Sequence, residues 1–358
     1  MTTDLLEVRN LSVDYLADDG TPLHAVDKVS FALGEGRSLG LVGESGCGKT
    51  TVMLSLLRLL PEEGRIVDGE VLFEGQDLLQ LSEAQMRQVR WHQLAMVFQG
   101  AMNALNPVRT VESQISEALR LHGFVDSSRD ARQRAGELLG MVGIPPERGR
   151  QYPHQYSGGM RQRAVIAMAL SCNPDIIIAD EPTTALDVIV QDRVLRKLEE
   201  IQRRLEMALI YISHDIAVIA EVSDRIGIMY AGHLVELADS VDIFERSLHP
   251  YTHALIGAFP SIKGERKELK TLPGEPPDLL QPPPGRHMLR AHRLFEEERL
   301  IGLDGLCHLH GVCLLLNHRV SVESDLEVRR QGGAQFAEIS RQFLADETPA
   351  RGVGIKPV

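Results

Sequence analysis

The sequence predicts an α/β fold with a largely parallel sheet, because apolar strand-like runs alternate with helical patterns over about the first 260 residues. Three of these runs, at 37–42, 175–179 and 209–212, are short and apolar, and each leads into glycine-rich or polar sequence. Ligands of open α/β sheets bind at the carboxyl ends of strands. The three strand ends are therefore expected to bring polar groups to one place.

The run at 37–42 enters a glycine-rich turn, GESGCGKT, that fits the pattern G-x-x-x-x-G-K-[ST] at every position. Glycines let several backbone N–H groups point at an anion, and the next helix, predicted over 50–60 before Pro61, adds its positive N-terminus. Lys49 would reach the β- and γ-phosphates of ATP, and the Thr50 hydroxyl would bind Mg²⁺. The predicted ATP-binding residues of this turn are Gly43, Glu44, Ser45, Gly46, Cys47, Gly48, Lys49, Thr50 and Thr51.

Two carboxylates, Asp180 and Glu181, follow the apolar run at 175–179. Asp180 would hold Mg²⁺, and Glu181 would orient or deprotonate the attacking water. Two acids at an ordinary strand exit are the alternative, which the phosphate loop disfavours. His214 ends the run at 209–212 and would contact the γ-phosphate or the water, unless it is a structural histidine. Gln99 ends a further run and offers an amide oxygen to the metal or the water.

The amino-acid composition limits the classes of protein to which this chain can belong. The chain has 358 residues, 43% of them hydrophobic and 25% charged, with a net charge of −12 that disfavours a nucleic-acid-coating surface. No apolar run approaches the roughly 20 residues of a membrane span, and the N-terminus does not match a signal peptide. The chain is therefore expected in the cytoplasm. Its four cysteines do not form a disulfide framework, and reduced thiols are expected.

Together with the segment YSGGMRQR at 156–163, these motifs resemble the nucleotide-binding domain of ATP-binding cassette (ABC) proteins over roughly residues 4 to 260. The resemblance implies a P-loop fold with a mixed sheet core, an antiparallel β subdomain and an inserted helical subdomain. It places Tyr15 where an aromatic residue stacks on adenine, and His214 at the switch histidine. It places Gln99 in the loop to the helical subdomain, and Ala185-Leu186-Asp187 in a segment that crosses a dimer interface.

The serine–glycine–glycine sequence opens a helix, predicted over 158–170, and this helix start is a second anion-binding terminus. In the resembled family this element faces the γ-phosphate of a partner cassette. The resemblance therefore implies that Ser157, Gly158, Gly159 and Met160 act in trans. Two positions depart from the family pattern: Tyr156 replaces a usual leucine, and Gly100 replaces a common acidic residue. Neither removes a phosphate ligand.

Within the family, three segments resemble ATPase subunits of bacterial dipeptide and oligopeptide importers: 102–107 (MNALNP), 249–255 (HPYTHAL) and 272–276 (LPGEP). The resemblance implies ATP and Mg²⁺ as cofactors. The implied partners are a second, related ATPase chain, two transmembrane permease subunits and an extracytoplasmic solute-binding protein, with no nucleic acid. It also implies a peripheral location on the cytoplasmic face of the inner or plasma membrane. Nickel and other solute importers share these segments, so the solute stays open.

The predicted domains are 1–262, the nucleotide-binding domain with a helical subdomain at about 100–173; 263–290, a Pro-rich connector; and 291–358, an atypical tail. Related subunits follow the connector with cysteines that in some members hold an iron–sulfur cluster. Here no cysteine occurs between Gly285 and Cys307, so that ligand set is missing. The tail also contains Cys307, His308, His310 and Cys313. These four residues are either unpaired residues in an irregular tail or the ligands of a zinc site. A change of reading frame near Arg286 is a further alternative for the sequence of the tail.

Three other functions stay as rivals. A soluble cassette protein that acts on ribosomes or DNA usually carries two cassettes or a long coiled coil, and the sequence has one set of motifs and no sustained heptads. A regulatory cassette without hydrolysis is disfavoured by Glu181 and His214. Exporter cassettes are commonly fused to membrane segments, and this sequence contains no such segment.

Overall fold

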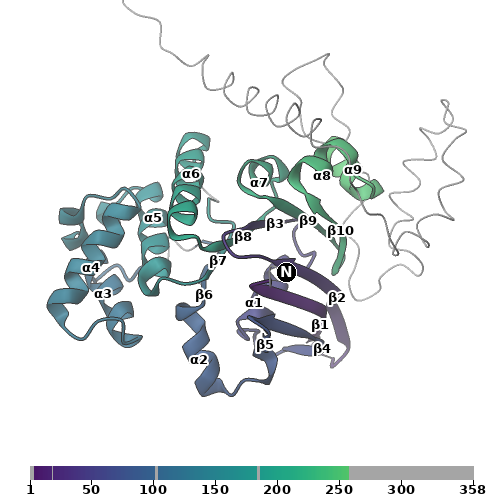
Figure 1. The fold of residues 1–358 in the computed structure, drawn as a ribbon, viewed down its shortest axis with the longest axis horizontal. Coiled ribbons are helices and arrows are strands. Elements are labelled where there is room, and N and C mark those ends of the chain that lie inside the picture. Colours follow the sequence, from purple (N-terminus) through teal and green to yellow (C-terminus); the bar gives the residue numbers. More distant parts are fainter. Residues whose placement is uncertain (1–3, 18, 101–103, 184–185, 258–358) are drawn as a thin grey trace, which may run out of the picture. The chain divides into compact units, whose positions relative to one another are not determined.

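The computed structural model describes residues 4–17, 19–100, 104–183 and 186–257. In this part of the chain, six strands form a sheet in the order β10-β9-β3-β8-β7-β6 (Figure 1). All neighbours pair in parallel except β10, which is antiparallel to β9. The strands are β3 (Ser38–Val42), β6 (Leu94–Val97), β7 (Ile176–Asp180), β8 (Ala208–Ser213), β9 (Arg225–Tyr230) and β10 (His233–Asp239).

The central strands of this sheet are buried on both faces, as expected for parallel strands covered by helices. Every residue of β3 and of β7 is buried. The register pairs Val42 with Ser213 and Asp180 with Ile212, so the carboxyl ends of β3, β7 and β8 lie at one edge. This alignment brings the three predicted polar strand ends together.

A second sheet is antiparallel and has the strand order β2-β1-β4-β5. Its strands are β1 (Leu6–Leu16), β2 (Pro22–Leu33), β4 (Gly64–Phe73) and β5 (Gln76–Asp77). Helix α1 (Lys49–Leu56) lies between the two sheets in Figure 1. Its residues Val52, Met53 and Leu56 share one apolar core with Leu6 of β1 and Ile178 of β7. Burial of α1 between the sheets positions the loop that precedes it.

The predicted end of this helix, at residue 60, is wrong, because α1 ends at Leu56. Arg58 takes the left-handed conformation with φ of 50°, which an α-helix cannot contain. The Arg58 guanidinium donates a hydrogen bond to the carbonyl of Leu81. The chain thus leaves the helix axis before Pro61 is reached.

Helices dominate the region between β6 and β7, where α3 (Val111–Leu121), α4 (Ser128–Met141) and α5 (Gly158–Ala169) pack on one another. They form a group beside the edge strand β6 (Figure 1). The bounds predicted for α3 are confirmed. Each of these helices begins at a hydroxyl N-cap, provided by Thr110, Ser127 and Ser157, whose oxygen accepts a backbone N–H of the first turn.

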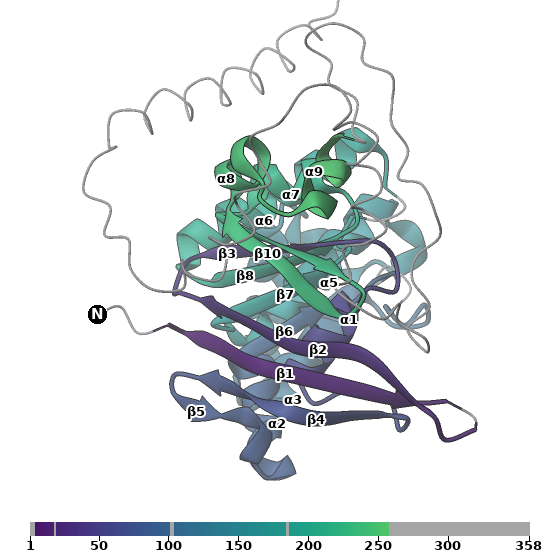
Figure 2. The same ribbon diagram turned by 90° about the vertical axis from the view of Figure 1, so that its right-hand side faces the viewer.

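The remaining helices are α2 (Glu83–His92), α6 (Val188–Leu205), α7 (Ile216–Val222), α8 (Ser240–Arg246) and α9 (Pro250–Gly257). Figure 2, turned by 90° from Figure 1, shows α8 and α9 above β10. No helix in the described ranges combines the length and the apolar character that a membrane crossing requires.

Several predicted features lie outside the described residues. They are Met102 and Asn103 of the segment 102–107, Ala185 of the interface segment, the connector at 263–290, the tail at 291–358 and the four residues Cys307, His308, His310 and Cys313.

Candidate functional site

The loop between β3 and α1 wraps around the ammonium group of Lys49. Lys49 Nζ donates to the carbonyl oxygens of Gly43 at 2.7 Å and Glu44 at 2.9 Å, and only 7% of the residue is exposed. The turn requires glycine at Gly48, which has φ of 102° and whose added Cβ would lie 2.5 Å from the Ala25 carbonyl oxygen. The loop therefore has the curvature and the inward cation of an anion-binding turn.

Strands β9 and β10 support this loop from behind through the turn that joins them. An added Cβ on Gly43 would lie 2.2 Å from the carbonyl oxygen of Met229. The N–H of Gly232 donates to the carbonyl of Cys47 at 3.1 Å. Cys47 is 5% exposed, and burial raises the pKa of its thiol, which marks it as a packing residue. The sequence motif did not identify this support, because the two segments lie more than 180 residues apart.

Asp180 lies at the end of β7, beside the start of α1. The carboxylate is 2% exposed and accepts a hydrogen bond from the Thr50 hydroxyl at 2.9 Å. Burial raises the pKa of Asp180; the Thr50 hydrogen bond and the Lys49 charge act against this shift, and the Glu181 charge adds to it. A buried carboxylate next to a hydroxyl is a pair of hard oxygen donors, which suits Mg²⁺.

Glu181 is held in a strained turn immediately after β7. Its φ of 45° lies in the left-handed region, and its N–H donates to the Ile212 carbonyl at 2.9 Å. Gln99 Nε2 donates to Glu181 Oε2 at 2.8 Å, and His214 Nδ1 lies 3.1 Å from Glu181 Oε1. The Glu181 side chain is 16% exposed and that of His214 is 66% exposed. Three residues that sequence analysis took from three strand ends thus meet at one carboxylate.

Tyr15, near the end of β1, approaches the same loop from the antiparallel sheet. Its hydroxyl lies 3.5 Å from Thr51 Oγ1, and its side chain is half-buried. The antiparallel sheet therefore places an aromatic side chain beside the start of α1.

The segment at Ser157–Met160 forms the N-cap and first turn of α5. Ser157 is exposed and accepts the Met160 N–H at 3.3 Å. An added Cβ on Gly159 would lie 2.3 Å from Cγ1 of Val190, so α5 begins in close contact with α6. Asp187 caps α6 by accepting the Val190 N–H at 3.0 Å. In the described residues, no hydrogen bond or ion pair joins Ser157 or Asp187 to the phosphate loop.

Comparisons with known family models and with known proteins all indicate the same family. A family model described as "ABC transporter" matches residues 26–184, and one described as "Oligopeptide/dipeptide transporter, C-terminal region" matches residues 235–287. The dipeptide transport ATP-binding protein DppD of Bacillus subtilis is 48% identical over 284 residues, which cover 78% of this chain and 84% of that protein. The chain belongs to the ATPase subunits of ABC importers for dipeptides and oligopeptides.

A second relative of this importer ATPase is the oligopeptide transport ATP-binding protein OppD of Bacillus subtilis, 45% identical over 287 residues, with 79% of this chain and 80% of that protein covered. Among solved structures, the dimeric ATP-binding cassette MJ0796 bound to ADP and Pi aligns with a TM-score of 0.59 and 26% identity. The alignment covers 66% of this chain and 98% of that one. The predicted family, fold class, ATPase activity and peptide-importer class are confirmed.

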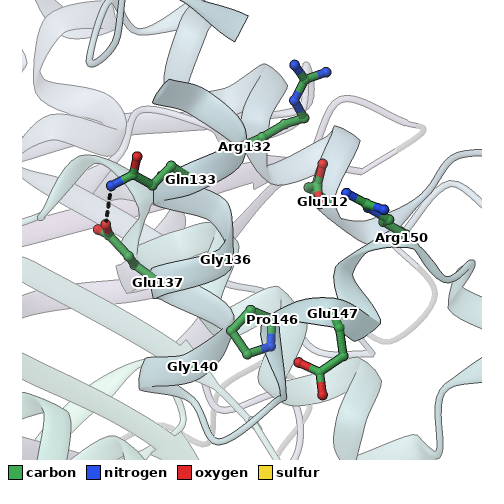
Figure 3. A pocket seen from close by; sticks show the side chains of 9 residues that line it. All are labelled: Glu112, Arg132, Gln133, Gly136, Glu137, Gly140, Pro146, Glu147 and Arg150. Atoms are coloured by element: carbon green, nitrogen blue, oxygen red, sulfur yellow. Dashed lines mark hydrogen bonds between the residues drawn. The ribbon is translucent and has the colours of Figure 1, made fainter. Parts of the chain in front are cut away.

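The helical region of this importer ATPase also contains a pocket, lined mainly by α4 and the segment at 146–150, with Glu112 of α3 (Figure 3). It has a volume of about 590 Å³. Its lining mixes opposite charges, and one of its side chains, Gln133, donates to Glu137 at 3.3 Å (Figure 3). None of its lining residues belongs to the phosphate loop or to the strand ends.

Proposed function

We propose that the loop at Gly43–Thr51 binds the phosphates of ATP and that Glu181 orients or deprotonates the water that attacks the γ-phosphate. One observation carries this proposal: Lys49, the Thr50–Asp180 pair and Glu181 converge at one edge of the parallel sheet. Phosphate oxygens would compete with the Gly43 and Glu44 carbonyls for Lys49 Nζ, and the N-terminus of α1 would add its partial positive charge. Tyr15 would stack on the adenine ring.

The residues around Thr50 fit a magnesium ion that is shared with the nucleotide. No group of three or more His, Cys, Asp or Glu side chains suited to a metal occurs among the described residues, which agrees with an ion that takes the rest of its ligands from phosphates and water. Thr50 and Asp180 would hold Mg²⁺, with the Gln99 amide oxygen as a further donor. When bound, Mg²⁺ neutralises developing charge on the phosphates. It would also favour the ionised form of Asp180, against the effect of burial.

Two contacts of Glu181 support its proposed action on water. Its two carboxylate oxygens are oriented by Gln99 and His214, and these contacts restrict the rotamers available to the side chain. The exposed His214 ring would contact the γ-phosphate or the water on its other side. Catalysis in this arrangement consists of positioning and charge stabilisation, as in other phosphoryl-transfer sites.

A second cassette would complete the site. ABC cassettes dimerise, and the exposed start of α5 would face the γ-phosphate held by the partner. Val188 and Ile189, beside Asp187, are 81% and 59% exposed, which is typical of apolar side chains at an interaction surface. The close approach of Gly159 to Val190 supports the proposal that Ser157, Gly158, Met160 and Asp187 form one interaction surface of α5 and α6.

The complete transporter would contain two such cassettes, formed by this chain and a related chain, two transmembrane permease subunits and an extracytoplasmic solute-binding protein. The cassettes would sit on the cytoplasmic face of the membrane through the permease subunits. Closure around two ATP molecules and reopening after hydrolysis would drive the permease between its two orientations. No nucleic acid partner is expected.

Replacement of the carboxylate tests the assignment. Glu181→Gln keeps the size of the side chain but removes its negative charge and its basicity, so hydrolysis should fall by about 10²- to 10⁴-fold. The mutant should still bind MgATP, measured by equilibrium binding, because the phosphate loop is intact. Glu137→Gln, on the exposed face of α4, is the matched control and should hydrolyse ATP at the parent rate. An unchanged rate of phosphate release by Glu181→Gln would refute the catalytic role.

A further inference from the structure

Two consecutive residues, Arg90 and Trp91, interrupt the end of α2 just before the chain enters β6 (Figure 1). Arg90 has ψ of 128°, and Trp91 has φ of 75°, which lies in the left-handed region. A bulky side chain rarely takes this conformation, and it persists only where surrounding contacts hold it. No step of the proposed hydrolysis uses either residue, yet both make long-range hydrogen bonds.

The Arg90 side chain binds the end of α1. Its Nε donates to the Leu57 carbonyl at 2.8 Å, and its Nη2 donates to the Arg58 carbonyl at 3.1 Å. A guanidinium suits this position, because the last carbonyls of a helix lack partners within the helix and carry partial negative charge. Arg90 therefore joins the segment between α2 and β6 to the helix that follows the phosphate loop.

The Trp91 side chain extends to the helical region instead. Its Nε1–H donates to the carbonyl of Met168, in the last turn of α5, at 3.1 Å. Its ring lies against that of His122, at the end of α3, with the ring centroids 5.1 Å apart. Adjacent residues thus contact the ends of two helices, α1 and α5, whose opposite ends carry the phosphate loop and Ser157.

The Trp91 hydrogen bond differs from the other contacts that hold α5. Much of α5 is apolar and packs in the same core as Val97 of β6, and apolar packing is non-directional. The Arg163 side chain of α5 donates to the carbonyls of Val142 and Gly143, which lie within the helical region itself. The bond from Trp91 is directional and comes from the segment that leads into the sheet, so it sets the position of α5 along its axis.

The length of α5 carries this constraint to the proposed phosphate contact. The helix has 12 residues and is about 18 Å long, with Met168 in its last turn and Ser157 as its N-cap. A helix moves nearly as a rigid rod, so a shift or tilt at Met168 displaces Ser157 at the other end. A displacement of about 1 Å is enough to weaken a hydrogen bond to phosphate.

We propose that Trp91 is a positioning residue for hydrolysis, whose hydrogen bond to Met168 holds α5 so that Ser157 meets the γ-phosphate of the partner cassette. This inference rests on the proposed function of Ser157. Arg90 fixes the same segment to α1, so the pair sets the position of Ser157 relative to the chain's own phosphate loop.

The test compares Trp91→Phe with Phe124→Leu in the full chain, with the related partner chain present. Phe124 is the matched control, because its ring belongs to the same aromatic group, 6.4 Å from the ring of His92 between centroids, and cannot donate a hydrogen bond. The kcat of ATP hydrolysis is measured below the unfolding temperature, and affinity for MgADP is measured by calorimetry.

Trp91→Phe should lower kcat about three- to tenfold, the effect of one net hydrogen bond, and should bind MgADP within twofold of the parent. Phe124→Leu should keep kcat within twofold. Parent-like kcat of Trp91→Phe, an equal loss in both variants, or a loss of MgADP affinity as large as the loss of kcat overturns the proposal.

The double mutant Ser157→Ala/Trp91→Phe tests whether Trp91 acts through Ser157. If it does, Trp91→Phe should change kcat by less than twofold once Ser157 is absent, because coupled residues are not additive. A full additional loss overturns the proposal. If Ser157→Ala alone hydrolyses ATP at the parent rate, the proposed function of Ser157 fails; if Ser157→Ala is impaired and Trp91→Phe is not, only the role of Trp91 fails.

A further measurement needs no variant, because Trp91 is the only tryptophan of the chain. Its indole N–H therefore gives a single signal in a proton–nitrogen correlation spectrum of the full chain. Exchange of this proton with water should be at least about tenfold slower than in free indole. Exchange at the rate of free indole would show that the bond to Met168 is absent, and would overturn the proposal.

Discussion

The contact between Gly159 and Val190 allows a quantitative prediction for Gly159→Ala. The new Cβ would lie 2.3 Å from Val190 Cγ1, whereas carbon atoms in contact prefer about 3.5–4.0 Å. The starts of α5 and α6 would have to separate by about 1.2–1.7 Å, and overpacking of this kind costs about 1–3 kcal/mol of the free energy of unfolding. Ser157 caps α5 and Asp187 caps α6, and both belong to the surface proposed to face the partner cassette. The same displacement should therefore also lower the ATP hydrolysis rate.

Two further variants make this prediction specific. Gly140→Ala, near the end of α4, places its Cβ 3.9 Å from the nearest atom and should stabilise the protein by about 0.4–1 kcal/mol. Val190→Ala removes the opposing methyl groups, so the double mutant Gly159→Ala/Val190→Ala should be more stable than the sum of the single effects predicts. Unfolding in urea measures the free energies. A stability of Gly159→Ala within 0.5 kcal/mol of the parent, or strict additivity in the double mutant, would refute the steric explanation.

Two more predictions concern buried polar groups. Burial raises the pKa of Asp180, so the folded chain binds a proton more tightly than the unfolded chain, and this contribution to stability is lost as pH rises through the folded pKa. Asp180→Asn should therefore raise the unfolding temperature of the nucleotide-free chain at pH 7 and abolish Mg²⁺-dependent hydrolysis; a lower unfolding temperature contradicts this account. Tyr156 donates its hydroxyl to the Arg148 carbonyl at 3.0 Å, so Tyr156→Phe should cost about 1 kcal/mol in urea unfolding, with the hydrolysis rate within twofold of the parent. A large rate loss at unchanged stability would assign Tyr156 to the site instead.

Most elements of the fold could be predicted because their signals are local. The helix at Val111–Leu121 has an apolar face of period 3.6 and a hydroxyl N-cap, and its bounds agree with the structure. The buried strands at β3 and β7 are uninterrupted apolar runs. The end of α1 was missed because Arg58 takes a left-handed conformation and contacts the distant Leu81, and no local pattern records either feature.

The candidate site shows the same division between local and long-range information. Sequence motifs identified Gln99, Glu181 and His214 one by one, each from its place at a strand end. All three meet at the Glu181 carboxylate because β8, β7 and β6 are neighbours in the sheet. The motifs alone do not predict this strand order.

The geometry of Ser157 supports a second cassette on physical grounds. As an N-cap, its oxygen accepts the Met160 N–H, and this leaves the hydroxyl hydrogen able to donate to an anion. The residue is exposed, on a helix start that carries partial positive charge. The phosphate loop already surrounds its anion site from within the chain, and no hydrogen bond joins Ser157 to that loop in the described residues. If Ser157 donates to a phosphate held by the partner cassette, hydrolysis by this chain should rise when the related partner chain is added.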